Sequence, residues 1–198
     1  IAGYYAPPGY SIEVLAASAG PVTSSNGVAL AAKDFRDSAG CDTLLIPGGL
    51  GARHRANYAE LLPFIRDTAA SGRRVASVCS GAFLLAEAGL LEGRKAATHW
   101  LEAPELARRH PGIEVDADSL FVNDGHIWTS AGITAGIDLA LALVEADCGA
   151  QAARQTAQTL VVPFRRLGTQ SQHSALLEMV TPDNRFSEVL AWARGRLA

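Results

Sequence analysis

The sequence has few cysteines, little charge and no long apolar run, and each shortage argues against a class of protein. Its three cysteines, Cys41, Cys79 and Cys148, are odd in number and widely spaced. This usage argues against a disulfide framework and favours a reducing, cytoplasmic setting. No apolar run approaches the roughly 20 residues that span a bilayer, so we expect no membrane contact. The net charge of -3 offers no general attraction to nucleic acid, so contact with DNA would require another segment.

Metal-binding and phosphate-binding motifs are also missing from the sequence. It contains no cluster of ligands with the spacing of a metal site and no P-loop, so we expect no metal and no other cofactor. Apolar residues, by contrast, are plentiful. Hydrophobic residues make up 48% and charged residues 19% of the 198 residues, which is typical of one globular domain with a large core.

A cysteine between a predicted strand and a predicted helix is the most informative feature of the chain. Residues 75–79 (VASVC) are apolar and rich in Val, as in a strand covered on both faces. Residues 80–86 (SGAFLLA) are rich in helix-forming Ala and Leu. A tight turn between them holds Cys79 beside N–H groups of the helix start, which favour a thiolate. The same elbow presents the nucleophile in α/β hydrolases.

Predicted strands and helices alternate along the chain, which indicates an α/β fold with a mostly parallel sheet sandwiched by helices. In such sheets, ligands bind beyond the carboxyl ends of the strands. Four predicted strands end in polar or glycine-rich sequence: at residues 47–49 (PGG), at Cys79, at His99 and at residues 129–132 (TSAG). Their convergence predicts a ligand site at this edge of the sheet.

The sequence also predicts the secondary structure of several individual segments. Residues 11–17 predict a strand, and residues 20–26, which are rich in turn formers, predict a loop. Residues 123–125 (NDG) predict a tight hairpin turn. Two separate helices are expected, over residues 133–144 and about 149–160.

Three motifs resemble the PfpI/ThiJ-like superfamily, relatives of the class I glutamine amidotransferases. They are residues 42–49 (DTLLIPGG), 75–100 (VASVCSGAFLLAEAGLLEGRKAATHW) and 128–145 (WTSAGITAGIDLALALVE). The resemblance implies a flavodoxin-like domain over residues 1–160 with a nucleophile-elbow cysteine. It also implies that the first strand and most of the first helix, with an acidic residue facing that cysteine, precede Ile1.

The motifs are closest in form to the PfpI-like domain of AraC-type transcriptional regulators. The Cys-Ser-Gly-Ala-Phe elbow, residues 98–100 (THW) and a VVP…R…G.Q.Q pattern in residues 161–172 carry this likeness. In such regulators, a segment like residues 161–198, with an amphipathic helix like residues 186–197, leads into two helix-turn-helix units. The resemblance places those units after Ala198.

Each candidate site residue also has a structural interpretation. Cys79 is either a nucleophile or a small residue that fits a crowded turn, and Ser80 either bonds a ligand or begins its helix. In the proteolytic members of the superfamily, the elbow cysteine is followed by His. In this chain Cys79 is followed by Ser80, which argues against a protease. His99 is either a general base or a hydrogen-bonded histidine at a strand end. Gly48 and Gly49 either offer N–H groups to an anion or form a turn.

Other polar residues are interpreted as structural. Asp138 is expected to interact with the N-terminal dipole of its helix, and Cys41 and Cys148 are expected to be inert. A mildly basic patch in the C-terminal segment is interpreted as a solvated linker face; it comprises Arg165, Arg166, Gln170, Gln172 and His173.

Two functions follow from the resemblance. The first is a ligand-sensing and dimerising domain of an AraC-like regulator, which binds a small amine- or amide-bearing effector near Cys79 and reaches DNA only through a domain outside this chain. The second is a cysteine-dependent hydrolase or hydratase similar to isonitrile hydratase. In that enzyme Cys79 would be the nucleophile, Ser80 a proton-handling hydroxyl, and Gly48 and Gly49 an anion cradle. The linker-like residues 161–198 favour the regulator.

Overall fold

The fold is built around a four-stranded sheet in the order β4–β5–β9–β8. The computed structural model describes residues 1–24, 26–54, 56, 58–162, 166–168, 172 and 192. Strands β4 (Thr43–Ile46), β5 (Arg74–Val78) and β9 (Ile127–Ser130) are parallel, and β8 (Phe121–Asp124) runs antiparallel to β9. The hairpin predicted at residues 123–125 joins β8 to β9 and is confirmed.

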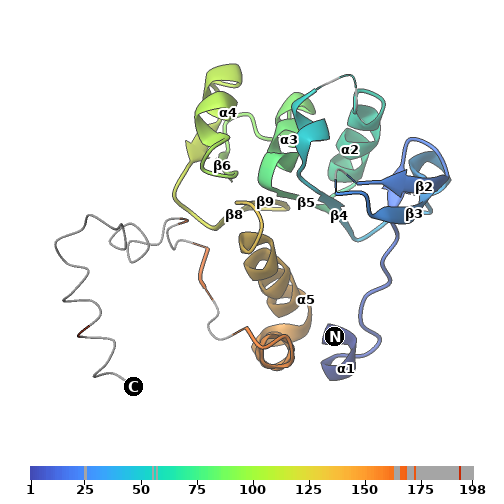
Figure 1. Cartoon of the computed structure of the whole chain (residues 1–198), viewed down its shortest axis with the longest axis vertical. Helices are drawn as coiled ribbons and strands as arrows, with labels where there is room; N and C mark the ends of the chain where they lie inside the picture. Colours follow the sequence, from blue (N-terminus) through green and yellow to red (C-terminus); the bar gives the residue numbers. More distant parts are fainter. Residues whose placement is uncertain are drawn as a thin grey trace.

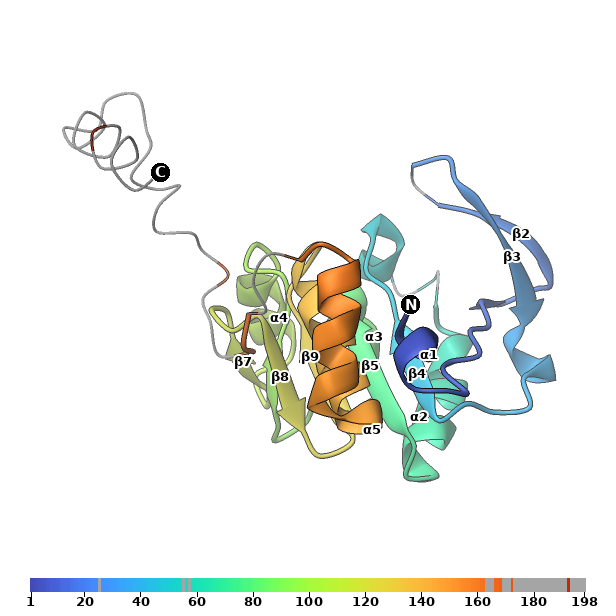
Figure 2. The same ribbon diagram turned by 90° about the horizontal axis from the view of Figure 1, so that it is seen from below.

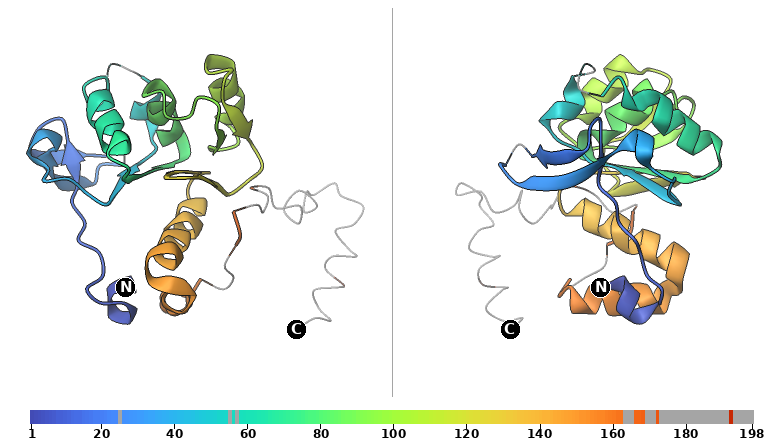
Figure 3. Two further views of the ribbon diagram at one scale, coloured as in Figure 1. Left: turned by 180° about the vertical axis from the view of Figure 1, so that it is seen from behind. Right: turned by 90° about the vertical axis from the view of Figure 1, so that its right-hand side faces the viewer.

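Helices cover both faces of this sheet, as expected for an α/β fold. Helices α2 (Leu61–Ala70) and α3 (Ala82–Glu87) lie on one face, and α5 (Ala135–Thr159) lies on the other (Figures 1 and 3). Successive side chains of β5 point to opposite faces of the sheet. Both faces are covered by helices, so most side chains of this strand are apolar. Val75 packs in the cluster that includes α2 and α3, whereas Ala76 packs with Leu139 of α5.

A second, two-stranded sheet extends the fold beside β9. Its strands, β6 (Lys95–Ala97) and β7 (Glu114–Asp116), are parallel and are connected through α4 (Ala103–Arg109). The side chain of Thr129 on β9 accepts a hydrogen bond of 2.8 Å from the Ala97 N–H. This bond brings the carboxyl end of β6 to the same edge as the ends of the central strands.

The N-terminal part forms a third sheet, in which β3 (Ala29–Asp34) lies between β1 (Leu15–Ala16) and β2 (Gly20–Thr23). The strand expected over residues 11–17 is only two residues long. The loop expected over residues 20–26 is wrong in its first half, because β2 pairs antiparallel with β3. Figure 2 shows this hairpin curving away from the central sheet.

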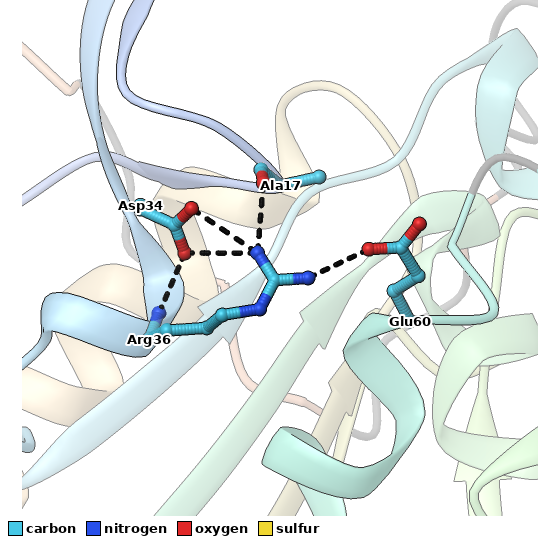
Figure 4. Close-up of polar contacts among 4 residues, drawn as sticks. All are labelled: Ala17, Asp34, Arg36 and Glu60. Atoms are coloured by element: carbon cyan, nitrogen blue, oxygen red, sulfur yellow. Dashed lines mark hydrogen bonds and ion pairs between the residues drawn. The ribbon is translucent and has the colours of Figure 1, made fainter.

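An arginine fastens the third sheet to the rest of the molecule. Arg36 lies in the 3-10 helix η1 (Phe35–Asp37) that follows β3. Its guanidinium donates to the Ala17 carbonyl at 3.0 Å, to the Asp34 carboxylate at 3.1 Å and to the Glu60 carboxylate at 2.7 Å (Figure 4). Glu60 directly precedes α2, so the hairpin is tied to the helical layer.

The C-terminal half of α5 bends back toward the N-terminus. The expectation of two helices, over residues 133–144 and about 149–160, is confirmed, because α5 consists of two helices that meet at a kink where Gly149 has a non-helical φ of 85°. Helix α1 (Ala2–Tyr5) packs beside α5 (Figure 2). No helix in the described part of the chain is long and apolar enough to cross a membrane. The helix expected over residues 186–197 falls outside the described residues, apart from Trp192.

Candidate functional site

The carboxyl ends of four strands meet around Cys79, as the sequence predicted. A Cβ added to Gly48, after β4, would lie 2.7 Å from the Cβ of Cys79. A Cβ added to Gly132, after β9, would lie 2.5 Å from Cδ2 of His99 and 3.0 Å from Sγ of Cys79. The thiol and the imidazole are therefore close neighbours. Gly48 and Gly132 are both needed as glycine, because their backbone lies so close to Cys79 and His99 that a side chain would collide with them.

The elbow at Cys79 has a strained backbone. Cys79 begins the 3-10 helix η4 (Cys79–Gly81) with a positive φ of 56°, which residues other than glycine rarely adopt. Neighbouring strands hold it there: Thr98 donates its hydroxyl to the Cys79 carbonyl at 2.8 Å. A Cβ on Gly81 would lie 2.5 Å from the Ile46 carbonyl oxygen, so only glycine fits the turn. Such a constrained conformation is typical of functional sites.

The hydroxyl of Ser80 is engaged within the protein. Ser80 is buried, accepts a hydrogen bond from the Gly49 N–H at 2.9 Å and donates one to the Gly49 carbonyl at 3.0 Å. Each bond is within the normal range. The N–H of Gly49 is therefore already used, and Ser80 joins the loop after β4 to the elbow.

The ring of His99 is fixed in one orientation. Its Nδ1 accepts a hydrogen bond of 3.2 Å from the Leu101 N–H, and the ring stacks on Trp100 with centroids 5.8 Å apart. The His99 carbonyl accepts from the N–H groups of Glu102 and Ala103 at 2.7 Å and 3.1 Å. Because Nδ1 is an acceptor, the proton of the neutral imidazole lies on Nε2.

A cavity of about 380 Å³ is lined by none of Gly48, Gly49, Cys79, Ser80 and His99, although two of its lining residues, Leu101 and Glu102, follow His99 closely in the chain. Its lining comprises Arg53, Phe83, Leu101, Glu102, Glu105 and Arg109. Arg53, in the 3-10 helix η2 (Leu50–Arg53) that follows Gly49, forms an ion pair with the buried Glu102. The sequence-predicted site and this cavity are therefore lined by different side chains.

Two residues of the C-terminal segment are bound to the domain, which corrects the expectation of a solvated face. Arg166 donates from Nη2 to the buried carboxylate of Asp138 at 2.7 Å, so Asp138 serves an ion pair and not only the helix dipole. The carboxamide of Gln172 bonds backbone groups near His99. Neither contact has a local sequence signal, because both partners are distant in the chain. Arg165, Gln170 and His173 fall outside the described residues.

The other two cysteines are half-buried and free, and burial raises the pKa of the Cys41 thiol. A higher pKa leaves less thiolate at neutral pH, which agrees with an unreactive residue. Across the described residues, no three His, Cys, Asp or Glu side chains are grouped so that they could hold a metal ion.

Comparison with known proteins places this fold and site in a family. Residues 5–146, which include the elbow and all four strand ends, match the DJ-1/PfpI family. The chain belongs to the DJ-1/PfpI family. Membership confirms the expected resemblance and the α/β fold with its elbow cysteine.

Curated proteins that resemble this chain include an enzyme and regulators. An isonitrile hydratase of Pseudomonas putida is 40% identical over 136 residues, which cover 68% of this chain and 58% of that protein. The HTH-type transcriptional regulator CdhR of Pseudomonas aeruginosa is 34% identical over 157 residues, which cover 77% and 45%. The chain thus spans about half the length of these curated relatives.

A solved structure agrees with the regulators. The crystal structure of an AraC family transcriptional regulator from Pseudomonas putida matches with a TM-score of 0.72 and 25% identity, over 80% of this chain and 85% of that one. HTH-type transcriptional regulators are therefore among the sequence relatives of this DJ-1/PfpI chain, and an AraC family regulator is among its structural relatives.

Proposed function

We propose that this chain is the ligand-sensing and dimerising part of an AraC-like transcriptional regulator. A small amine- or amide-bearing effector would bind at the strand ends around Cys79 and His99, with Gly48, Gly49 and Ser80 shaping the floor of the site. In this proposal residues 1–160 form the sensing domain, residues 161–198 lead out of it, and DNA is contacted by a helix-turn-helix region beyond Ala198.

The hydrogen bond to Nδ1 of His99 carries the choice of binding over catalysis. A general base needs a nitrogen lone pair that can take the thiol proton. In His99 the lone pair of Nδ1 faces the Leu101 N–H, and Nε2 holds the proton. No carboxylate of the described residues contacts the ring to reverse this tautomer. The site then offers a thiol and an N–H donor, which suit the recognition of a polar ligand.

Ligand screening by thermal unfolding tests this proposal. A panel of small amine- and amide-bearing metabolites is added to the wild type, to Cys79→Ala and to the control Cys148→Ala, which removes a thiol from α5. A ligand at 100 times its Kd should raise the midpoint of the wild type and of the control by about 5–10 °C. Cys79→Ala should show a smaller rise. Equal rises in all three, or no rise with any compound, would contradict binding at Cys79.

The 40% identity to an isonitrile hydratase supports a second candidate, a cysteine-dependent hydratase. The strained elbow at Cys79 agrees with it, because nucleophiles are often presented in this way. The two candidates differ in turnover. If an alkyl isonitrile is hydrated by the wild type and not by Cys79→Ala, the chain is an enzyme; equal background rates in both support the sensing domain.

A further inference from the structure

The side chain of Gln172 binds the backbone on both sides of His99. Its Nε2 donates to the Thr98 carbonyl at 2.9 Å, and its Oε1 accepts from the Trp100 N–H at 2.9 Å. The same Nε2 also lies 3.0 Å from the carbonyls of Ala117 and Ser119. One carboxamide thus joins the end of β6, where His99 lies, to the turn after β7.

A second attachment joins Arg166 to the start of α5. Arg166 donates from its backbone N–H, Nε and Nη2 to the Asp138 carboxylate at 3.2, 3.1 and 2.7 Å, and from Nη2 to the Thr134 hydroxyl at 3.0 Å. Thr134 lies two residues after Gly132, which contacts both Cys79 and His99. Between the two attachments, the Gly168 carbonyl accepts from the Leu120 N–H at 2.7 Å.

We infer that Gln172 couples the Cys79–His99 site to the segment that leaves the domain, so that occupancy of the site changes how firmly residues 166–168 and 172 are docked. This inference rests on the proposed function and names the contact through which occupancy of that site would affect the segment leaving the domain. The backbone at residues 98–100 carries both the ring that faces the thiol and the groups that bind Gln172. A group at the site that shifts the backbone of residues 98–100 would therefore also disturb the bonds to Gln172.

The coupling is reciprocal by thermodynamic necessity. If an occupied site weakens docking of the segment, undocking weakens binding at the site by the same factor. Contact alone does not establish such coupling; a change at one end must alter the equilibrium at the other. The Leu120 amide reports docking directly, because its acceptor is Gly168 and not Gln172.

Alkylation of Cys79 with iodoacetamide tests the coupling without any effector. Cys41 and Cys148 are replaced by Ser in every sample so that Cys79 is the only thiol, and amide hydrogen exchange is followed residue by residue by NMR. The carbamidomethyl group occupies the space beside Gly132 and His99. In the chain with Gln172, alkylation should speed exchange at Leu120 and Trp100 by about tenfold, the effect of losing one hydrogen bond.

Three variants decide whether Gln172 transmits the effect. In Gln172→Ala, Trp100 should already exchange fast before alkylation, and alkylation should no longer change Leu120. Gln172→Glu keeps the acceptor for Trp100 but loses the donor to three carbonyls, so it should also uncouple Leu120, and it provides the test if the alanine variant fails to fold. The matched control Gln158→Ala, which truncates an exposed glutamine on α5, should behave as the wild type.

Two results would overturn the inference: no response of Leu120 to alkylation when Gln172 is present, or the same response in the Gln172 variants. Neither result bears on effector binding, which is measured by thermal unfolding with Cys79→Ala. A chain that binds an effector but shows no response at Leu120 is a sensor without this coupling. A chain that responds at Leu120 but hydrates isonitriles has the coupling and a different function.

Discussion

At the scale of single residues, the site is defined by how closely backbones approach Cys79. Gly48 and Gly132 lie so near the thiol that any side chain there would enter the site. Ser80 and His99 use their polar atoms to fix the loops around it, and Thr98 holds the carbonyl of the elbow itself. The chemistry available to a ligand is therefore set by what these internal bonds leave unused.

Gly132→Ala should damage the site more than the fold. The new methyl group would lie 2.5 Å from the His99 ring and 3.0 Å from the Cys79 thiol, so both must shift. We expect a loss of about 1–3 kcal/mol in the free energy of unfolding, typical of overpacking, and slower alkylation of Cys79. Urea unfolding and the rate of reaction with iodoacetamide measure the two effects.

Gly136→Ala is the matched control for that substitution. Its Cβ would meet only Val78, at 3.3 Å, and alanine favours the helix by about 1 kcal/mol over glycine. The alkylation rate should stay at the wild-type value. If Gly132→Ala also left both quantities unchanged, the close approach of thiol, ring and glycine would be wrong.

At the scale of elements, the sequence predicted the strands whose residue pattern is local. It did not predict strands that form only by pairing with another strand. The Val-rich run of β5, the elbow and the Asn-Asp-Gly turn were all predictable, because burial and turn chemistry are visible in adjacent residues. Strand β2 was not, since Gly20 and Pro21 are typical of loops and form a strand only through pairing with β3.

The placement of the residues around Cys79 was also predictable only where the signal is local. Cys79, His99, Gly48 and Gly132 each follow a predicted strand. Parallel strands bring their carboxyl ends to one edge of a sheet, so these residues were expected to lie together. The contacts of Gln172 and Arg166 link residues far apart in the chain, the nearest of them 28 positions from its partner. Local patterns carry no information about such pairs, so Arg166 and Gln172 were misinterpreted as part of a solvated face.

Gly168→Ala should detach that segment from β8. A Cβ at this position would lie 2.6 Å from the Phe121 carbonyl oxygen and 2.9 Å from its ring, so the chain must move away. The Leu120 and Phe121 N–H groups, which donate to Gly168 at 2.7 and 3.3 Å, would then lose their acceptor. We expect about tenfold faster hydrogen exchange at Leu120.

The Ala97 amide is the internal control for that experiment. It donates to the Thr129 hydroxyl within the fold and not to any described residue of the segment, so its exchange should not change. Slow exchange at Leu120 in Gly168→Ala would show that the segment stays docked despite the added methyl group, and would contradict the geometry of this contact.

At the scale of the whole molecule, one carboxylate joins three distant parts of the chain. Asp147 on α5 accepts two hydrogen bonds from Arg74, at the start of β5, at 2.9 and 2.7 Å, and one from the Tyr10 hydroxyl at 2.8 Å. The helix on one face, the central strand and the N-terminal segment therefore share a single charged group. The Arg74 hydrogen bonds, supported by Tyr10, lower the pKa of Asp147 despite its partial burial.

Asp147→Asn should therefore lower stability in a manner that depends on pH. A depressed pKa means that the carboxylate stabilises the fold above its unfolded pKa of about 3.9 and loses this contribution as pH falls through the lower folded value. We expect the variant to be about 1–2 kcal/mol less stable at pH 7, as for a lost hydrogen bond to a charged group, with the difference shrinking below about pH 4. Urea unfolding across this range measures it. Glu105→Gln removes an exposed carboxylate paired with Arg108 and should leave the free energy of unfolding close to the wild-type value. A difference for Asp147→Asn that stays constant down to pH 3 would assign the effect to shape and not to the charge that links the three parts.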